Sequence, residues 1–102
     1  MTASSDVVQA TAVALDGRAL LIEGEPGAGK SSLALALIER GATLIGDDGV
    51  SLTRTGQGEK AYIVATPPPN IEGLLEVRGG GRARFPVAEP TPLALVLTLG
   101  VQ

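Results

Sequence analysis

Short runs of apolar residues alternate with turn-forming residues along most of the chain, and this pattern predicts several strands. Residues 7–15 and 19–23 are two such runs, and the Asp16-Gly17 pair between them favours a tight two-residue turn. We therefore predict that the two strands form a β-hairpin. Residues 1–6 come before the first strand and are expected to be a flexible tail.

A single helix is predicted over residues 31–40, where leucine and alanine dominate the sequence. Leu33, Ala36 and Leu37 fall at helical spacing, so they define an apolar face. Gly41 follows the last helical residue and is expected to cap the C-terminal end. The order strand, glycine-rich stretch, helix is the feature around which the chain is organised.

The second half of the chain is predicted to hold further strands separated by turns. Residues 50–53 and 61–64 are expected to pair as a second hairpin, and residues 43–45 form another short strand. Three prolines at residues 67–69 favour an extended connector rather than a partner-binding motif. Residues 93–99 are almost entirely apolar and are predicted to be a buried strand.

The stretch between the first hairpin and the helix matches the phosphate-binding loop pattern G-x-x-x-x-G-K-[ST] without a gap. Its glycines allow backbone N–H groups to surround phosphate oxygens, Lys30 can reach the β- and γ-phosphates, and Ser31 can offer its hydroxyl to Mg²⁺. The alternative is a glycine-rich turn that binds nothing. The candidate nucleotide-binding residues are Gly24, Glu25, Pro26, Gly27, Ala28, Gly29, Lys30, Ser31 and Ser32.

Composition narrows the chemistry that the chain can perform. Its 102 residues are 44% apolar, carry a net charge of −3 and include neither cysteine nor histidine. This is typical of one folded domain over residues 1–102, and the negative charge argues against nucleic acid as a partner. Thiolate and imidazole chemistry are excluded, so a general base has to be a carboxylate or Lys30. No apolar run could span a membrane and no signal peptide is evident, so we expect a cytoplasmic protein.

Two adjacent carboxylates, Asp47 and Asp48, follow a short apolar strand and are flanked by Gly46 and Gly49. Ligand sites of open α/β sheets gather at the carboxyl ends of strands. One carboxylate could accept a proton from a substrate hydroxyl while the other holds a metal ion. The alternative is a solvated Asp-Gly turn without a chemical role.

Glu76 and Arg78 precede a run of three glycines at residues 79–81. On a strand, these two side chains would share a face because they are two residues apart. The alternative to a functional role is a surface ion pair beside a loop.

The order of these motifs resembles the catalytic domain of HPr kinase/phosphorylase in its short proteobacterial form. The motifs are the phosphate-binding loop, Ile38-Glu39-Arg40-Gly41, Asp47-Asp48 and Leu75-Glu76-Val77-Arg78-Gly79. The resemblance implies an α/β fold of the HPr kinase-like (PEP carboxykinase-like) class. Such a fold has a small mixed sheet with β-hairpins and a helix after the phosphate-binding loop.

The resemblance also implies an ATP- and Mg²⁺-dependent kinase that phosphorylates a serine of the phosphocarrier protein HPr, with reverse phosphorolysis in many members. By the same resemblance Asp47, Lys30 and Arg78 would be the catalytic residues, with Asp47 as the base. The metal would be held by Ser31, Asp48 and Glu76. Self-association is expected as well, because the core is small and poor in aromatic residues.

The sequence departs from the family pattern at two places: Gln9 stands where the family has a histidine, and Gly79-Gly80-Gly81-Arg82 replaces the usual Gly-Leu-Gly-Ile. Glutamine cannot titrate. Two other functions therefore remain as alternatives to a protein kinase. One is a nucleotide- or phosphate-binding regulatory module without catalysis, and the other is a kinase of small hydroxyl metabolites.

Overall fold

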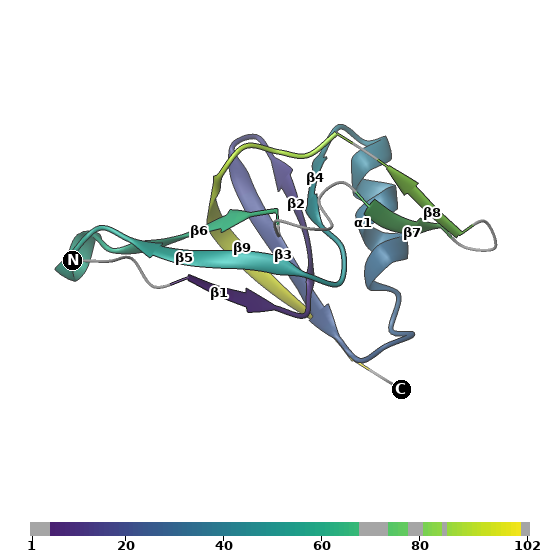
Figure 1. The fold of residues 1–102 in the computed structure, drawn as a ribbon, viewed down its shortest axis with the longest axis horizontal. Helices are drawn as coiled ribbons and strands as arrows, with labels where there is room; N and C mark the ends of the chain where they lie inside the picture. Colours follow the sequence, from purple (N-terminus) through teal and green to yellow (C-terminus); the bar gives the residue numbers. More distant parts are fainter. Residues whose placement is uncertain (1–4, 68–73, 78–80, 85, 101–102) are drawn as a thin grey trace.

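The computed structural model describes residues 5–67, 74–77, 81–84 and 86–100 of the chain. A seven-stranded mixed sheet with the strand order β1-β5-β6-β9-β3-β2-β4 carries one helix, α1, on one face (Figure 1). A separate two-stranded sheet lies beside the helix. The elements are β1 (Ser5–Val8), β2 (Thr11–Leu15), β3 (Arg18–Gly24), α1 (Lys30–Glu39), β4 (Thr43–Gly46), β5 (Val50–Thr55), the 3₁₀ turn η1 (Gly58–Lys60), β6 (Tyr62–Thr66), β7 (Leu74–Val77), β8 (Gly81–Arg84) and β9 (Thr91–Leu99).

The first predicted hairpin is confirmed by antiparallel pairing of β2 with β3, from Thr11 opposite Ile22 to Leu15 opposite Arg18. Asp16 and Gly17 both have positive φ, at 53° and 75°. This is the geometry of a type I′ turn, whose twist matches that of the flanking strands. The Asp-Gly pair therefore determines the hairpin locally.

The prediction of one strand over residues 7–15 is wrong, because the chain changes partners between β1 and β2. Val8 of β1 pairs with Val50 of β5, whereas β2 pairs with β3 and β4. Gln9 and Ala10 form the break between them. The expected tail is also wrong for Ser5 and Asp6, which belong to β1, and the other residues of that tail lie outside the described ones.

Helix α1 packs on β2, β3 and β4 and starts one residue earlier than predicted. Its end at Gly41 agrees with the predicted cap: Gly41 has φ of 111°, and its N–H donates to the carbonyl of Ile38 at 3.0 Å. The helix closes one of two small cores, formed by the buried side chains of Val13, Ile22, Ala34, Ala42 and Leu44. The second core lies within the curled sheet and contains Ala10, Ala12, Ala19, Leu21, Ile45, Val50 and Ala65.

The second half of the chain forms the predicted strands β4, β5 and β6, and β5 pairs with β6 as a hairpin. Strand β9 is present, but the prediction that it is buried is wrong. Leu95 is 55% exposed and Val96 is 46% exposed. The helix packs on β2, β3 and β4, so it does not bury the middle of β9. Of the three prolines, Pro67 follows β6 and the other two lie outside the described residues.

Strand directions bring four chain segments to one edge of the sheet. Parallel pairing sets Gly24 at the end of β3 opposite Leu99 at the end of β9. Antiparallel pairing of β2 with β4 sets Ala12 opposite Gly46, so the start of β2 lies beside the end of β4. The glycine-rich loop, the Asp47-Asp48 pair and the first residues of β2 therefore share this edge.

Candidate phosphate-binding site

The glycine-rich loop connects β3 to α1, which is the strand–loop–helix context that the motif requires (Figure 1). Gly27 and Gly29 have φ of 87° and 101°, and a Cβ added at either position would meet nothing within 4 Å. The loop is braced by a hydrogen bond from the N–H of Ala28 to the carbonyl of Glu25 at 3.0 Å. Its backbone is thus folded tightly, with open space beside the two glycines into which an anion could fit.

The N-terminus of α1 adds a partial positive charge to this loop. The N–H of Leu33 donates to the carbonyl of Gly29 at 3.0 Å. The N–H groups before Leu33 therefore lie in the first turn, where a helix offers no carbonyl partner of its own. The first turn of α1 holds no acidic residue. Both features favour binding of an anionic group at this helix end.

The side chain of Lys30 is hydrogen-bonded to backbone carbonyl groups of the loop. Its Nζ donates to the carbonyl of Gly24 at 2.7 Å and to that of Glu25 at 3.2 Å. These bonds place the ammonium group over the start of the loop. A compact positive charge therefore sits where the loop and the helix end could together surround phosphate oxygens.

Next to the loop, one carboxylate oxygen of Asp47 accepts hydrogen bonds from two hydroxyl groups. Ser31 Oγ donates to Asp47 Oδ1 at 2.7 Å, and Thr11 Oγ1 donates to the same oxygen at 2.9 Å. Ser31 comes from the first turn of α1, Asp47 follows β4, and Thr11 begins β2. Ser31 and Asp47 are predicted from the sequence, whereas Thr11 is not. The only signal for Thr11 was a polar residue between two alanines in an apolar strand, at the hairpin end that meets the loop.

The adjacent carboxylates of Asp47 and Asp48 lie in different environments. Asp47 is half-buried and contacts Ser31, whereas Asp48 is exposed and has φ of 59°. Within the described part of the chain, no three His, Cys, Asp or Glu side chains gather as metal ligands would. The backbone of Glu76 lies in β7, and Arg78 lies outside the described residues. The metal set Ser31, Asp48 and Glu76 stays a prediction.

The donor atoms that do meet suit the expected ligands. A hydroxyl and a carboxylate are hard oxygen ligands of the kind that Mg²⁺ prefers. The loop and the helix end supply N–H donors and a cation for phosphate. Ser31 and Asp47 thus fit a magnesium–nucleotide phosphate group at this edge.

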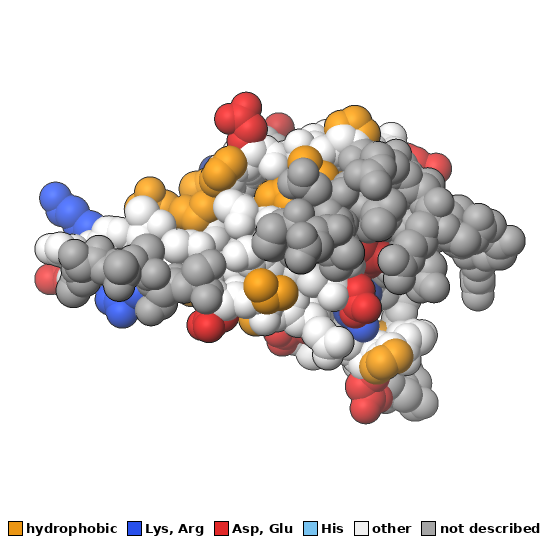
Figure 2. Space-filling model, in the orientation of Figure 1, with side chains coloured by type: hydrophobic (Ala, Val, Ile, Leu, Met, Phe, Trp, Pro, Cys, Tyr) orange, Lys and Arg blue, Asp and Glu red, His pale blue; other side chains and the backbone are white. Residues whose placement is uncertain are grey.

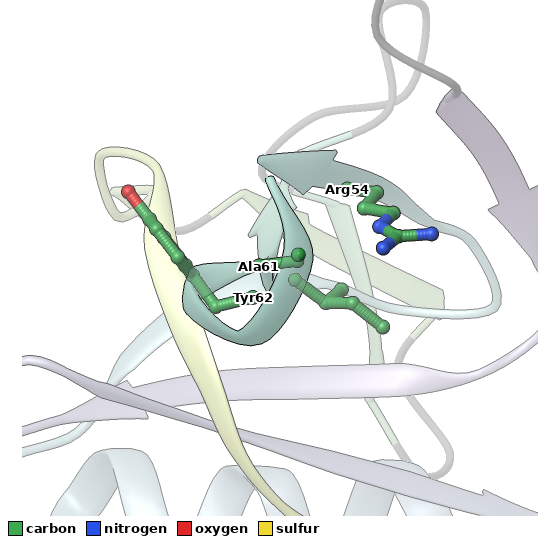
Figure 3. Close-up of a pocket in the computed structure, with 5 residues that line it drawn as sticks. Arg54, Ala61 and Tyr62 are labelled. Carbon is green, nitrogen blue, oxygen red and sulfur yellow. The ribbon is translucent and has the colours of Figure 1, made fainter. Parts of the chain in front are cut away.

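A pocket at the end of the molecule far from the glycine-rich loop is lined by Arg54, Gly58, Ala61, Tyr62 and Ile63 (Figure 3). These residues come from the tip of the β5–β6 hairpin, which extends away from the glycine-rich loop (Figure 1). Arg54 is the cation of this pocket, and the ring of Tyr62 points away from it in the close-up. We assign no role in phosphate binding to this pocket.

In the part of the chain that is described, none of the helical structure has the length and hydropathy needed to cross a bilayer.

Comparisons with known proteins show which family the chain resembles. The family model described as "HPr Serine kinase C-terminal domain" matches residues 1–83. An HPr kinase/phosphorylase of Bordetella pertussis is 51% identical over 65 residues, covering 64% of this chain and 20% of the relative. One from Exiguobacterium sibiricum is 45% identical over the same length and covers the same shares. The chain spans about a fifth of the length of these curated relatives.

A solved structure has the same fold. The Hpr(Ser) kinase/phosphatase of Coxiella burnetii superimposes with a TM-score of 0.75 at 28% identity, covering 91% of this chain and 58% of that one. The expected α/β kinase-like fold is thereby confirmed. Since the family model matches most of the sequence, the chain belongs to the HPr serine kinase C-terminal domain family.

Proposed function

We propose that this chain is an ATP-dependent serine kinase domain that phosphorylates a serine of the phosphocarrier protein HPr, as its relatives' names indicate. The observation that carries the proposal is the convergence of Lys30, Ser31 and Asp47 at the glycine-rich loop. Reverse phosphorolysis, self-association and a cytoplasmic location belong to the same proposal.

In this proposal the loop and the N-terminus of α1 bind the phosphates of ATP, and Lys30 neutralises their charge. Bound Mg²⁺ would offset the negative charge that the phosphate oxygens carry. A hydroxyl can donate and accept hydrogen bonds at once. Ser31 can therefore offer a lone pair to the cation while its O–H still donates to Asp47. Asp48 and Glu76 are proposed as further residues around the metal.

Asp47 is proposed as the general base. The substrate serine oxygen forms a bond to the γ-phosphorus as the bond between that phosphorus and the bridging oxygen breaks, and ADP leaves. The serine proton passes to Asp47, and in the reverse direction Asp47 returns it. Arg78 is proposed to add positive charge to the same active site. In this proposal, positioning and charge neutralisation add to the contribution of the base.

The test is transfer of labelled γ-phosphate from ATP to purified HPr in the presence of Mg²⁺, for the wild type and Asp47→Asn. We expect the substitution to lower turnover by about 10²–10⁴-fold and to spare nucleotide binding measured by calorimetry. Asp16→Asn is the matched control. It makes the same change in the exposed turn at the other end of the β2–β3 hairpin and should leave turnover unaltered.

The second candidate function is a nucleotide-binding regulatory module without catalysis. It is favoured by Gln9, which is exposed at the break between β1 and β2 and stands where the family has a titratable histidine. A wild-type chain that binds ATP but labels no acceptor would establish this candidate. Label on small alcohols and none on HPr would instead indicate a metabolite kinase.

A further inference from the structure

Thr11 lies at the phosphate-binding edge but belongs to none of the motifs found in the sequence. Its side chain is fully buried, with 0% exposure, in a strand whose neighbouring residues are alanine and valine. A buried hydroxyl needs a hydrogen-bond partner, and Thr11 finds one in Asp47 Oδ1 at 2.9 Å. The residue that Thr11 contacts is therefore the proposed general base.

An irregularity in the sheet produces this contact. Between β2 and β4, Val13 lies opposite Leu44, but Ala12 lies opposite Gly46, so β4 contains one extra residue at this point. Continuing the shifted register places Asp47 across from Thr11. Without the bulge, Thr11 would face Gly46. Bulges next to functional sites often redirect a side chain in this way.

Two elements other than β4 then contact the carboxylate. The hydroxyls of Thr11 and Ser31 both donate to Oδ1, one from the start of β2 and one from the first turn of α1. Whether or not Ser31 Oγ also binds a cation, the bond from Thr11 is a contact from the sheet that orients Asp47. Thr11 also has few ways to move, because it is buried and opposite Ile22 in the hairpin.

We propose that Thr11 is a positioning residue that holds Asp47 in the orientation needed for proton transfer. The inference rests on the proposed function, in which Asp47 is the base. Thr11 acts through Asp47 and touches no reacting atom. Partners of this kind typically alter activity by about 10–100-fold when they are removed.

The test compares the kinetics of the wild-type chain with those of two variants. Thr11→Val removes the hydroxyl at nearly constant volume, and Thr11→Ser keeps it. We expect Thr11→Val to lower kcat by about 10–100-fold with the KM for ATP unchanged. Thr11→Ser should restore most of the loss. In the Asp47→Asn background, Thr11→Val should cause no further loss of residual turnover, because the two residues act as one unit.

Thr91→Val is the matched control. Thr91 is also a buried threonine, 6% exposed, and its hydroxyl donates to the carbonyl of Glu89 at 2.7 Å. It lies at the start of β9, whereas the glycine-rich loop meets the end of that strand. Its substitution should change stability without changing kcat.

Several results would overturn the inference: equal kcat in Thr11→Val and wild type, a change in KM alone, or failure of Thr11→Ser to rescue. An inactive wild type overturns the proposed function instead. In that case urea unfolding of Thr11→Val, Asp47→Asn and the double variant still decides whether the two side chains are coupled. Additive losses there would overturn the contact itself.

Discussion

The two halves of the seven-stranded sheet differ in how well their apolar side chains are covered. In β3, β2 and β4, beneath α1, Ile22 and Leu44 are completely buried and Val13 is 1% exposed. In the other half, Val50 and Ala65 are buried in the second core, but Ile63 of β6 and Leu95 of β9 are 41% and 55% exposed. Figure 2 shows hydrophobic side chains at the surface on the side of the β5–β6 hairpin and also on the side that holds α1. The ten-residue helix contacts β2, β3 and β4 of this sheet.

The candidate site is built in the covered half. Thr11, Ser31 and Asp47 each stand at the end of an element that packs into the core beneath α1. Side chains held on packed helices and strands keep their relative geometry better than side chains on loops. Burial by α1 therefore does two things: it stabilises these strands, and it fixes the hydroxyls relative to the carboxylate.

Replacing one leucine by alanine in each half tests whether the two halves are covered differently. Leu44→Ala empties a fully buried position and should lower the free energy of unfolding by about 2–5 kcal/mol. Leu95→Ala removes the same atoms from a side chain that is 55% exposed, and should cost less than about 1 kcal/mol. Urea unfolding followed by circular dichroism measures both.

Equal losses at the two positions would contradict this picture of the sheet. They would mean that Leu95 is covered in solution, for example by a second copy of the chain. Repeating the Leu95→Ala measurement over a range of protein concentrations separates these cases, since only a stability that includes association depends on concentration.

Local signals in the sequence were enough to predict the elements that hold the site. The Asp16-Gly17 turn determines the first hairpin, and the leucine- and alanine-rich run with Gly41 determines the helix to within one residue at each end. The loop pattern placed Lys30 and Ser31 at the helix start. In each case the information lies within a few neighbouring residues, which is why it could be read without the fold.

Features that depend on distant partners could not be read in this way. The break at Gln9 arises because β1 pairs with β5, about forty residues away in the register. The exposure of Leu95 depends on which strands α1 covers. The contact of Thr11 with Asp47 depends on a bulge in β4, and no turn-forming residue in the sequence indicates that bulge. Composition alone made residues 93–99 look buried, although burial is a property of the packed neighbours.

The next prediction concerns the junction between the loop and β9. Gly24 has φ of 155°, and a Cβ built there would lie 2.9 Å from the carbonyl oxygen of Leu99. Gly24→Ala should lower the free energy of unfolding by about 1–3 kcal/mol, because a backbone atom has to move. Gly100→Ala is the control, since a Cβ at Gly100 meets nothing within 4 Å.

Thermal unfolding of Gly24→Ala, Gly100→Ala and the wild type gives the comparison directly. A loss at Gly24 no larger than at Gly100 would show that β3 and β9 separate easily at this end. The loop would then be less firmly attached to the sheet than the register of Gly24 with Leu99 indicates.

The smallest effect is expected one residue before Gly24, on the exposed side of the same strand pair. Thr98 Oγ1 donates to Glu23 Oε2 at 3.1 Å, and both side chains are exposed. Because water can replace either partner, Thr98→Val, Glu23→Gln and the double variant should each change the free energy of unfolding by less than about 0.5 kcal/mol. Urea titrations of the three variants test this. A loss well above that value would mean that the bond is shielded from water, so that this end of β9 behaves like the half of the sheet beneath α1.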